Sequence, residues 1–309
     1  MSQTVTSSLS SAPVETPLRV VVCSATHVGG RTENEDAVCV MELPQVGSGP
    51  TAAEGGYLLA VADGMGGYQR GEVAAQMAIE TLREMFTEDP GADPALLLKQ
   101  AFRRANERIY ENGLGTGPTA MMGTTLVAAV THGKYATIAN IGDSRAYLAR
   151  AKRLTQITKD HTVVAEQVAR GAMSEQQARE SPHRNVLTHA LGHRPKLEAK
   201  LPDIFEITLL PEDRLLLCTD GFYDVVPEDD LLRVVTESEP QEAAQDLVNL
   251  AVERGTSDNV SAAVLAVLPA REPELIAPGP SGARSALLLP VLAAIILILI
   301  LAAVLFFAL

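Results

Sequence analysis

The sequence predicts an α+β fold, with β-sheets at the centre and helices packed on their outer faces. Strand patterns occur in adjacent runs, and the longer helix patterns are grouped between these runs instead of alternating with single strands. A further segment, residues 286–309, carries no charged or polar side chain and predicts a transmembrane helix in addition to this domain.

The strand patterns are short and apolar, and Gly, Pro or Asp bounds them. They are Val20–Ala25, Tyr57–Ala62, Thr124–Val130, Tyr135–Asn140, Arg145–Ala149, Phe205–Leu210, Arg214–Thr219 and Val260–Val267. Cys39 lies in a further apolar, strand-like run.

Three segments repeat apolar residues at helical spacing, Gly71–Phe86, Pro94–Glu111 and Gln241–Arg254. The residues expected on their buried faces are Val73, Met77, Ala78, Leu82 and Phe86, then Leu98, Phe102, Ala105 and Ile109, then Ala244, Leu247, Val248 and Ala251.

The organisation along the chain follows from shifts in composition. Residues 1–18 are rich in Ser, Thr and Pro, and we expect a disordered leader there. Residues 19–268 form one domain, in which the polar stretch of about 161–200 is expected to be a flap. Ser174 and Gln177 have the spacing of a capping box that opens a short helix within it. Residues 269–285 are rich in Pro, Gly and Ala and predict a linker.

The segment 286–309 would form a helix about 35 Å long, which exceeds the roughly 30 Å of a bilayer's hydrocarbon core. A buried core helix is the alternative, but such helices seldom lack polar residues over this length. Arg271 and Arg284 precede the segment, and basic residues prefer the cytoplasmic side of a membrane. We therefore expect a single-pass membrane protein with a C-terminal anchor and a cytoplasmic domain.

The overall composition excludes one class of partner. The formal net charge is −13, from 38 acidic and 25 basic side chains, and there is no Trp. A nucleic-acid binder needs a basic face, so no nucleic-acid partner is expected. The three cysteines, Cys23, Cys39 and Cys218, form no C-x-x-C pair, and we expect buried, reduced thiols.

Acidic residues stand at the ends of several strand patterns. Asp63 and Asp220 each follow a strand and precede a Gly, Asp143 follows Gly142, and Asp258 precedes the strand Val260–Val267. A single Asp-Gly pair would indicate only a turn. Four such acids indicate a shared crevice if the strands lie side by side, and clustered carboxylates need protons or cations to compensate their repulsion.

Oxygen ligands of this kind favour Mg²⁺ or Mn²⁺, whereas the chain has no His or Cys cluster typical of zinc. Two ions that share a carboxylate can hold a water between them, lower its pKa and direct the resulting hydroxide at phosphorus. Arg31 could orient the phosphate through its planar guanidinium. A surface salt bridge is the alternative for this arginine.

Seven short motifs then occur in order: Arg31 with Asn34-Glu35-Asp36, Asp63-Gly64-Met65-Gly66-Gly67, Gly123-Thr124-Thr125, Gly142-Asp143-Ser144-Arg145, Thr158-Lys159-Asp160-His161, Thr219-Asp220-Gly221 and Ser257-Asp258-Asn259-Val260. This series resembles the metal-dependent protein serine/threonine phosphatases of the type 2C family, in particular the bacterial branch. The resemblance covers about residues 19–268.

The resemblance implies a central β-sandwich of two antiparallel sheets flanked by helices, with two or three Mn²⁺ or Mg²⁺ ions between the sheets. It implies that Asp63 bridges two metals, that Gly64 offers its carbonyl, and that Asp220 and Asp258 hold the other ion. Glu35 and Asp36 would act through waters or as supporting residues. Asp143, together with Asp220, would form a third metal site. Arg31 would bind the substrate phosphate, and Asn259 would fix Asp258.

The resemblance also implies a monomeric catalytic domain that acts on phosphorylated proteins, including serine/threonine kinases and their substrates. Two positions depart from the family pattern. Some relatives carry His where this chain has Met65, and bacterial members usually carry His where it has Tyr68, so the general acid is unassigned. His161 or a metal-bound water are the candidates.

Two other functions compete with this one. A phosphatase for a phosphoserine regulator of transcription would be favoured by adjacent sensor domains, and none is seen. A catalytically inactive sensor would be favoured by loss of a metal aspartate, whereas Asp63, Asp220 and Asp258 are all present.

Overall fold

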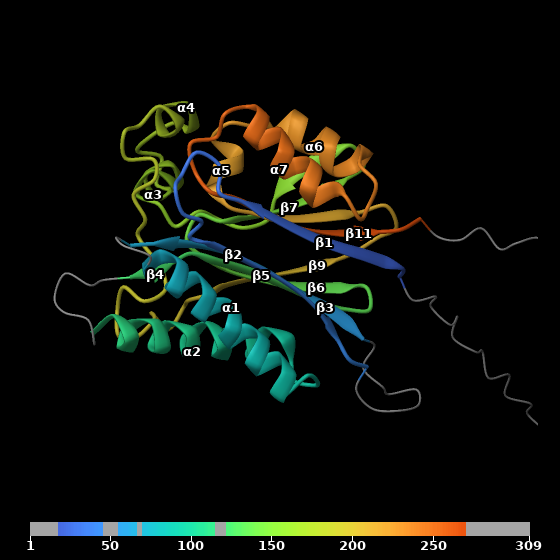
Figure 1. Ribbon diagram of the computed structural model, residues 1–309, viewed down its shortest axis with the longest axis horizontal. Helices are drawn as coiled ribbons and strands as arrows, with labels where there is room; N and C mark the ends of the chain where they lie inside the picture. Colours follow the sequence, from blue (N-terminus) through green and yellow to red (C-terminus); the bar gives the residue numbers. More distant parts are fainter. Residues whose placement is uncertain (1–17, 46–54, 67–69, 115–121, 270–309) are drawn as a thin grey trace, which may run out of the picture. The chain divides into compact units, whose positions relative to one another are not determined.

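Two antiparallel β-sheets lie face to face in the computed structural model, and helices cover the outer face of each sheet (Figure 1). The structure describes residues 18–45, 55–66, 70–114 and 122–269. Apolar side chains fill the space between the sheets and the space under each helical layer. This arrangement confirms the predicted sandwich of two sheets flanked by helices.

One sheet contains the strands near both ends of the domain. Its spatial order is β1 (Val20–His27), β11 (Val260–Val267), β10 (Arg214–Cys218), β7 (Arg145–Arg150) and β8 (Arg153–Gln156). All of its pairings are antiparallel, so neighbouring strands run in opposite directions.

The second sheet has the order β2 (Asp36–Leu43), β3 (Gly56–Met65), β5 (Leu126–His132), β6 (Tyr135–Ile141) and β9 (Asp203–Thr208), and the short β4 (Gly123–Thr124) pairs with the end of β3. Val61 and Val127 of this sheet pack against Leu217 and Leu265 of the other sheet.

Each sheet is covered by its own layer of helices. Helices α1 (Arg70–Glu88) and α2 (Pro94–Leu114) cover the second sheet, where the small side chains of Ala74, Ala75 and Ala78 are fully buried. Helices α5 (Asp220–Tyr223), α6 (Glu228–Glu237) and α7 (Ala243–Glu253) cover the first sheet. The alanines let α1 approach the strands closely, which matters for the site described below.

The predicted flap contains helices α3 (Val163–Ala169) and α4 (Glu175–Arg179). The capping box is confirmed, because Ser174 Oγ accepts from the Gln177 backbone while the Gln177 side chain accepts from the Ser174 backbone. Leu191, near the end of the flap, pairs with Thr124 of β4. The flap is therefore joined to the edge of the second sheet.

Several sequence expectations need correction. Val73 is 43% exposed, because the buried stripe of α1 runs along Ala74, Ala78 and Leu82, about 100° around the helix from it. The strand expected at Phe205–Leu210 is β9, which begins two residues earlier and ends at Thr208. A tight turn follows, with Glu212 at a φ of 71° and Leu210 N donating to Asp213 Oδ2.

Helix α6 was not predicted, although Pro227 followed by three acids in the first turn is a recognisable start signal. The three cysteines are all free, as expected, and Cys39 and Cys218 are buried, whereas Cys23 in the edge strand β1 is only half-buried. In the part of the chain that the structure describes, we find no helix with the length and apolar character needed to span a bilayer. The predicted transmembrane segment 286–309 lies outside that part, as do the leader and linker apart from Leu18 and Pro269.

Candidate functional site

Five aspartates from both sheets gather at one end of the sandwich. We call Asp36, Asp63, Asp143, Asp220 and Asp258 the carboxylate cluster. Asp36 begins β2 and is paired in register with Asp63 of β3. Asp143 lies between β6 and β7, Asp220 begins α5 directly after β10, and Asp258 precedes β11. Each strand therefore delivers its acid to the same end, as the sequence predicted for four of the five.

Asp63 is the centre of the cluster. Burial raises the pKa of Asp63 well above its usual value, and the charges of Asp36, Asp220, Asp143 and Asp258 raise it further. The Asp63 carboxyl lies within hydrogen-bonding reach of Asp220. The pKa of Asp63 thus depends on the charge of every other member of the cluster.

The other members also hold protons more tightly than free aspartates do. Burial and the charge of Asp258 raise the pKa of Asp220 to about 6. Burial raises the pKa of Asp36 to about 7, although hydrogen bonds from Ser261 and Thr219 act in the opposite direction. Burial and the charge of Asp220 raise the pKa of Asp143 to about 7. Such a cluster is stable only with protons or cations.

The residues present fit hard divalent metal ions. Oδ1 of Asp36 and Oδ1 of Asp220 are buried and have no hydrogen-bond partner among the described residues. Oxygen atoms of this kind suit Mg²⁺ or Mn²⁺, which would supply the missing interactions. As the side chains stand, no three His, Cys, Asp or Glu residues in the described ranges are arranged to chelate one ion.

The turn after Asp63 is held by backbone contacts on both sides. The Asp63 carbonyl accepts from Thr125 N at 2.9 Å and Thr124 Oγ1 at 2.8 Å. Gly64 N donates to Glu35 O at 3.1 Å. A Cβ at Gly64 would lie 2.1 Å from the carbonyl oxygen of Gly71, so only glycine allows α1 to lie so close to this turn. The predicted carbonyl ligand Gly64 is therefore fixed in place.

Asn259 links the loop before β2 to the start of β11. Its Oδ1 accepts from Glu35 N at 2.8 Å, and its Nδ2 donates to Val28 O and Glu33 O at 2.9 Å each. Its backbone N–H donates to Asp258 Oδ1 at 2.8 Å. These contacts fit the supporting role predicted for Asn259, because they orient Asp258 and place Glu35 and Asp36.

Glu35 and Arg31 lie at the rim of the cluster. The Glu35 carboxylate accepts from the Gly71 backbone in the first turn of α1, which favours a supporting role. The Arg31 guanidinium donates to Asp258 Oδ2 at 2.7 Å, with 56% of the Arg31 side chain exposed. Arg31 thus forms an ion pair with a member of the cluster, and its contact with a substrate phosphate stays a prediction.

A half-buried cation close to Asp143 was not singled out from the sequence. Arg145 donates to both oxygens of Asp160, and its guanidinium carbon lies 3.5 Å from the centre of the Tyr223 ring. The Tyr223 hydroxyl in turn donates to the Asp143 backbone carbonyl at 3.1 Å. Arg145 and Asp160 belong to predicted motifs, whereas nothing in the sequence pattern indicated Tyr223.

His161 is held by protein groups at both ring nitrogens. Its Nδ1 accepts from Gly142 N at 3.2 Å, and its Nε2 lies 3.4 Å from Asp203 Oδ2. Burial lowers the pKa of His161. The ring therefore supports the loop that carries Asp143 and is poorly placed to deliver a proton to a substrate.

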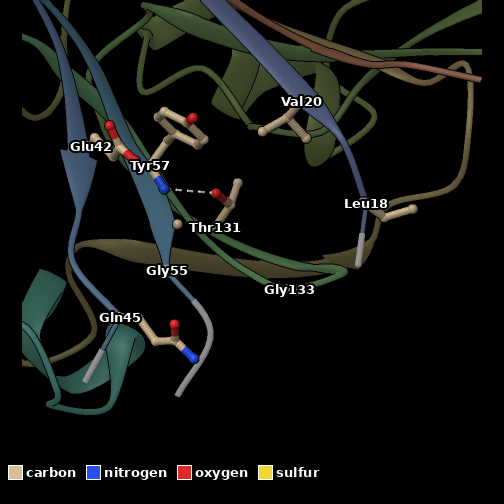
Figure 2. A pocket seen from close by; sticks show the side chains of 9 residues that line it. Leu18, Val20, Glu42, Gln45, Gly55, Tyr57, Thr131 and Gly133 are labelled. Atoms are coloured by element: carbon tan, nitrogen blue, oxygen red, sulfur yellow. Dashed lines mark hydrogen bonds between the residues drawn. The ribbon is translucent and has the colours of Figure 1, made fainter. Parts of the chain in front are cut away.

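A cavity of about 420 Å³ lies at the opposite end of the sandwich (Figure 2). It is lined by Leu18, Val20, Tyr57 and Thr131 among others, and Tyr57 N donates to Thr131 Oγ1 at 2.9 Å. Tyr57 stands near the beginning of β3, whereas Asp63 stands near its end. This cavity is therefore separate from the carboxylate cluster.

A sandwich with acids from both sheets at one end is suited to bind divalent metal ions, and comparison with known proteins gives the family. Residues 24–260 match the model of protein phosphatase 2C. The chain belongs to the protein phosphatase 2C family.

Relatives with named activities are serine/threonine phosphatases. The chain is 38% identical over 215 residues to serine/threonine protein phosphatase PstP of Mycobacterium tuberculosis, covering 69% of this chain and 41% of that protein. It therefore spans about two fifths of that relative. It is 34% identical over 209 residues to the serine/threonine phosphatase stp of Listeria monocytogenes, covering 66% of this chain and 82% of that protein.

A solved structure of the PstP catalytic domain in complex with two manganese ions is similar to this fold, with a TM-score of 0.67 and 34% identity. The match covers 81% of this chain and 98% of that one. The fold is therefore shared with a phosphatase domain that holds Mn²⁺.

Proposed function

We propose that this chain is an active, metal-dependent phosphatase that hydrolyses phosphoserine and phosphothreonine in proteins. The observation that carries the proposal is the carboxylate cluster, in which Oδ1 of Asp36 and of Asp220 are buried without a partner among the described residues. Family membership and the named relatives support the same reaction.

The proposed ligands are those that the sequence indicated. Asp63, Asp220 and Asp258 would hold two ions with the carbonyl of Gly64, and Asp143 would help to hold a third. When bound, Mn²⁺ or Mg²⁺ supplies an activated water and offsets negative charge on the phosphoryl oxygens.

The protein groups around the ions have separate tasks. Arg31 would leave Asp258 Oδ2 and bind two phosphate oxygens, since a guanidinium matches that geometry. Asn259 would keep Asp258 in position through its backbone N–H, and Asp36 would accept from Thr219 Oγ1, as it does at 3.1 Å here.

We also propose that the domain acts at a membrane, on kinases and their substrates. β11 runs from the cluster to Val267, a length of about 27 Å at roughly 3.4 Å per residue. The chain thus leaves the domain at the end opposite the carboxylate cluster (Figure 1).

Hydrolysis of a phosphothreonine peptide with and without Mn²⁺ tests the enzymatic proposal. Activity should require the metal, disappear with a chelator, and be nearly abolished by Asp63→Asn or Asp220→Asn, because each removes charge from the metal site. Asp89→Asn, at an exposed position after α1, is the matched control and should keep full activity. Full activity in chelator would refute the proposal.

A further inference from the structure

The imidazole of His193, in the flap, lies beside β4, the short strand that pairs with the end of β3. A Cβ on Gly123 would lie 2.8 Å from both Cδ2 and Nε2 of His193. The ring therefore occupies the space where a side chain at residue 123 would stand. Glycine at this position is what admits the histidine.

The register of β3 and β4 places this ring on the face that carries Asp63. Gly123 is paired with Met65, and Met65 follows Asp63 by two residues. Side chains alternate along a strand, and paired residues share a face. Gly64 points the other way, since its Cβ would meet backbone oxygens of Gly71 and Glu35. His193 thus lies beside Gly123 on the face of the sheet that carries Asp63.

The backbone on both sides of His193 is fixed, whereas its ring is only partly covered. Gly192 N donates to Asn106 Oδ1 and Asn106 Nδ2 donates to Arg194 O, both at 2.9 Å. Leu191 exchanges two hydrogen bonds with Thr124. The residue is exposed, and no described residue hydrogen-bonds to its ring nitrogens. This histidine is available to a bound substrate, in contrast to His161.

We propose that His193 is the general acid that protonates the departing serine or threonine oxygen. This step rests on the proposed phosphatase function. The water oxygen bonds to phosphorus, and the bond between phosphorus and the side-chain oxygen breaks with its electron pair remaining on that oxygen. The Nε2 proton of His193 moves to this oxygen, and the ring regains the proton that the attacking water released to solvent.

The location explains how the chain can lack histidine at residue 65. The ring reaches the same face of β3 from the flap instead of from the strand. In the free domain burial lowers the pKa of His193, and Arg194 lowers it further. A phosphate dianion at the site would act in the opposite direction, so substrate would itself favour the protonated ring.

Two substrates separate this role from a structural one. His193→Asn in the full-length protein should lower kcat on a phosphothreonine peptide by about 100-fold or more, which is the range for general acid catalysis. With p-nitrophenyl phosphate, whose phenolate departs without a proton, kcat should change little. His183→Asn, at another exposed flap position, should affect neither substrate.

A rescue variant and a spectroscopic measurement complete the test. Met65→His in the His193→Asn protein should restore part of the peptide activity, because it places an imidazole on the same face. In NMR spectra of the wild type, exchanging Mg²⁺ for Mn²⁺ should broaden the His193 imidazole signals more than those of His132, which ends β5 at the opposite end of the sandwich.

Equal losses on both substrates in His193→Asn, or broadening no greater than for His132, would overturn the acid role and leave the phosphatase function standing. A wild type that hydrolyses neither substrate with Mn²⁺ would instead remove the proposed function itself.

Discussion

Arg31 Nη2 lies 2.7 Å from Asp258 Oδ2, so the proposed phosphate-binding residue is held by a proposed metal ligand. The hydrogen bond to Asp258 raises the pKa of Arg31, and the charges of Asp63 and Asp220 add to this effect. Both partners are partly exposed, with 56% and 34% of their side chains accessible, so the pair adds little to stability. Arg31 would have to leave Asp258 in order to bind a substrate phosphate, and Asp258 would then be available to a metal ion.

Arg31→Ala should lower kcat/KM on phosphopeptides by roughly 10–100-fold, because a charge-assisted contact to phosphate contributes about 1.5–3 kcal/mol. The Mn²⁺ concentration for half-maximal activity should not rise, since the substitution frees Asp258. Steady-state kinetics across several peptides and metal concentrations measure both effects. Arg170→Ala, which removes an arginine that is 74% exposed on the flap, is the control. An unchanged kcat/KM would show that Arg31 is only a surface charge.

The metal-free domain should lose stability as the pH rises. The pKa values of Asp36 and Asp143 are raised to about 7 and that of Asp220 to about 6, whereas unfolded aspartates titrate near about 3.9. A raised pKa contributes stability below the unfolded value, and this contribution is lost as the pH passes through the folded value. The loss therefore falls between about pH 4 and pH 7.

Thermal unfolding in chelator should show Tm falling by at least about 5 °C between pH 5 and pH 8, since 1 kcal/mol corresponds to about 2–4 °C in a domain of this size. Asp36→Asn should reduce the fall, because the neutral amide carries no charge at either pH. Saturating Mn²⁺ should abolish it, since the ion replaces the protons. A Tm that rises over this range would contradict the buried, proton-sharing cluster.

Asn259→Ala should weaken metal binding and the fold together. It removes the acceptor for Glu35 N and both donors to Val28 and Glu33, each worth about 0.5–1.5 kcal/mol. We expect the half-saturating Mn²⁺ concentration to rise about 10–100-fold, as for other residues that orient metal ligands. Activity titrations with Mn²⁺, alongside denaturant unfolding, test this. Gln245→Ala on the exposed face of α7 is a matched control, and an unaltered Mn²⁺ requirement would exclude the supporting role.

The strands and the acidic residues at their ends could be predicted from the residues themselves, for a physical reason. Strand periodicity and the residues at strand ends are local signals, and antiparallel pairing then carries Asp36 and Asp63 to the same position in register. The layer order and the individual roles of the acids came from the motif resemblance, since periodicity alone does not say which sheets face each other.

Contacts that depend on long-range packing were not predictable. The ring of Tyr223 on Arg145 and the ring of His193 on Gly123 join segments that are 78 and 70 residues apart in the sequence. The exposure of Val73 depends on how α1 is rotated against the sheet, and a pattern of apolar spacing fixes that rotation only approximately.

Deleting residues 286–309 should release the enzyme from membranes without changing kcat on a soluble peptide. The segment lies outside the described residues, so its role as an anchor remains a prediction from its apolar sequence. The domain should be unaffected, because the chain leaves β11 at Val267, about 27 Å along the strand from the carboxylate cluster. Confinement at the membrane would raise the effective concentration toward membrane-bound substrates, so the truncated enzyme should dephosphorylate such substrates more slowly.

Fractionation of both forms, with kinetics on a soluble and on a vesicle-tethered phosphopeptide, separates the two effects. Substituting Val252→Ala on the exposed face of α7 controls for a general loss of apolar surface. The anchor would be ruled out if the full-length protein fractionates as freely soluble. It would also be ruled out if the full-length and truncated forms dephosphorylate the tethered and soluble peptides at the same relative rates.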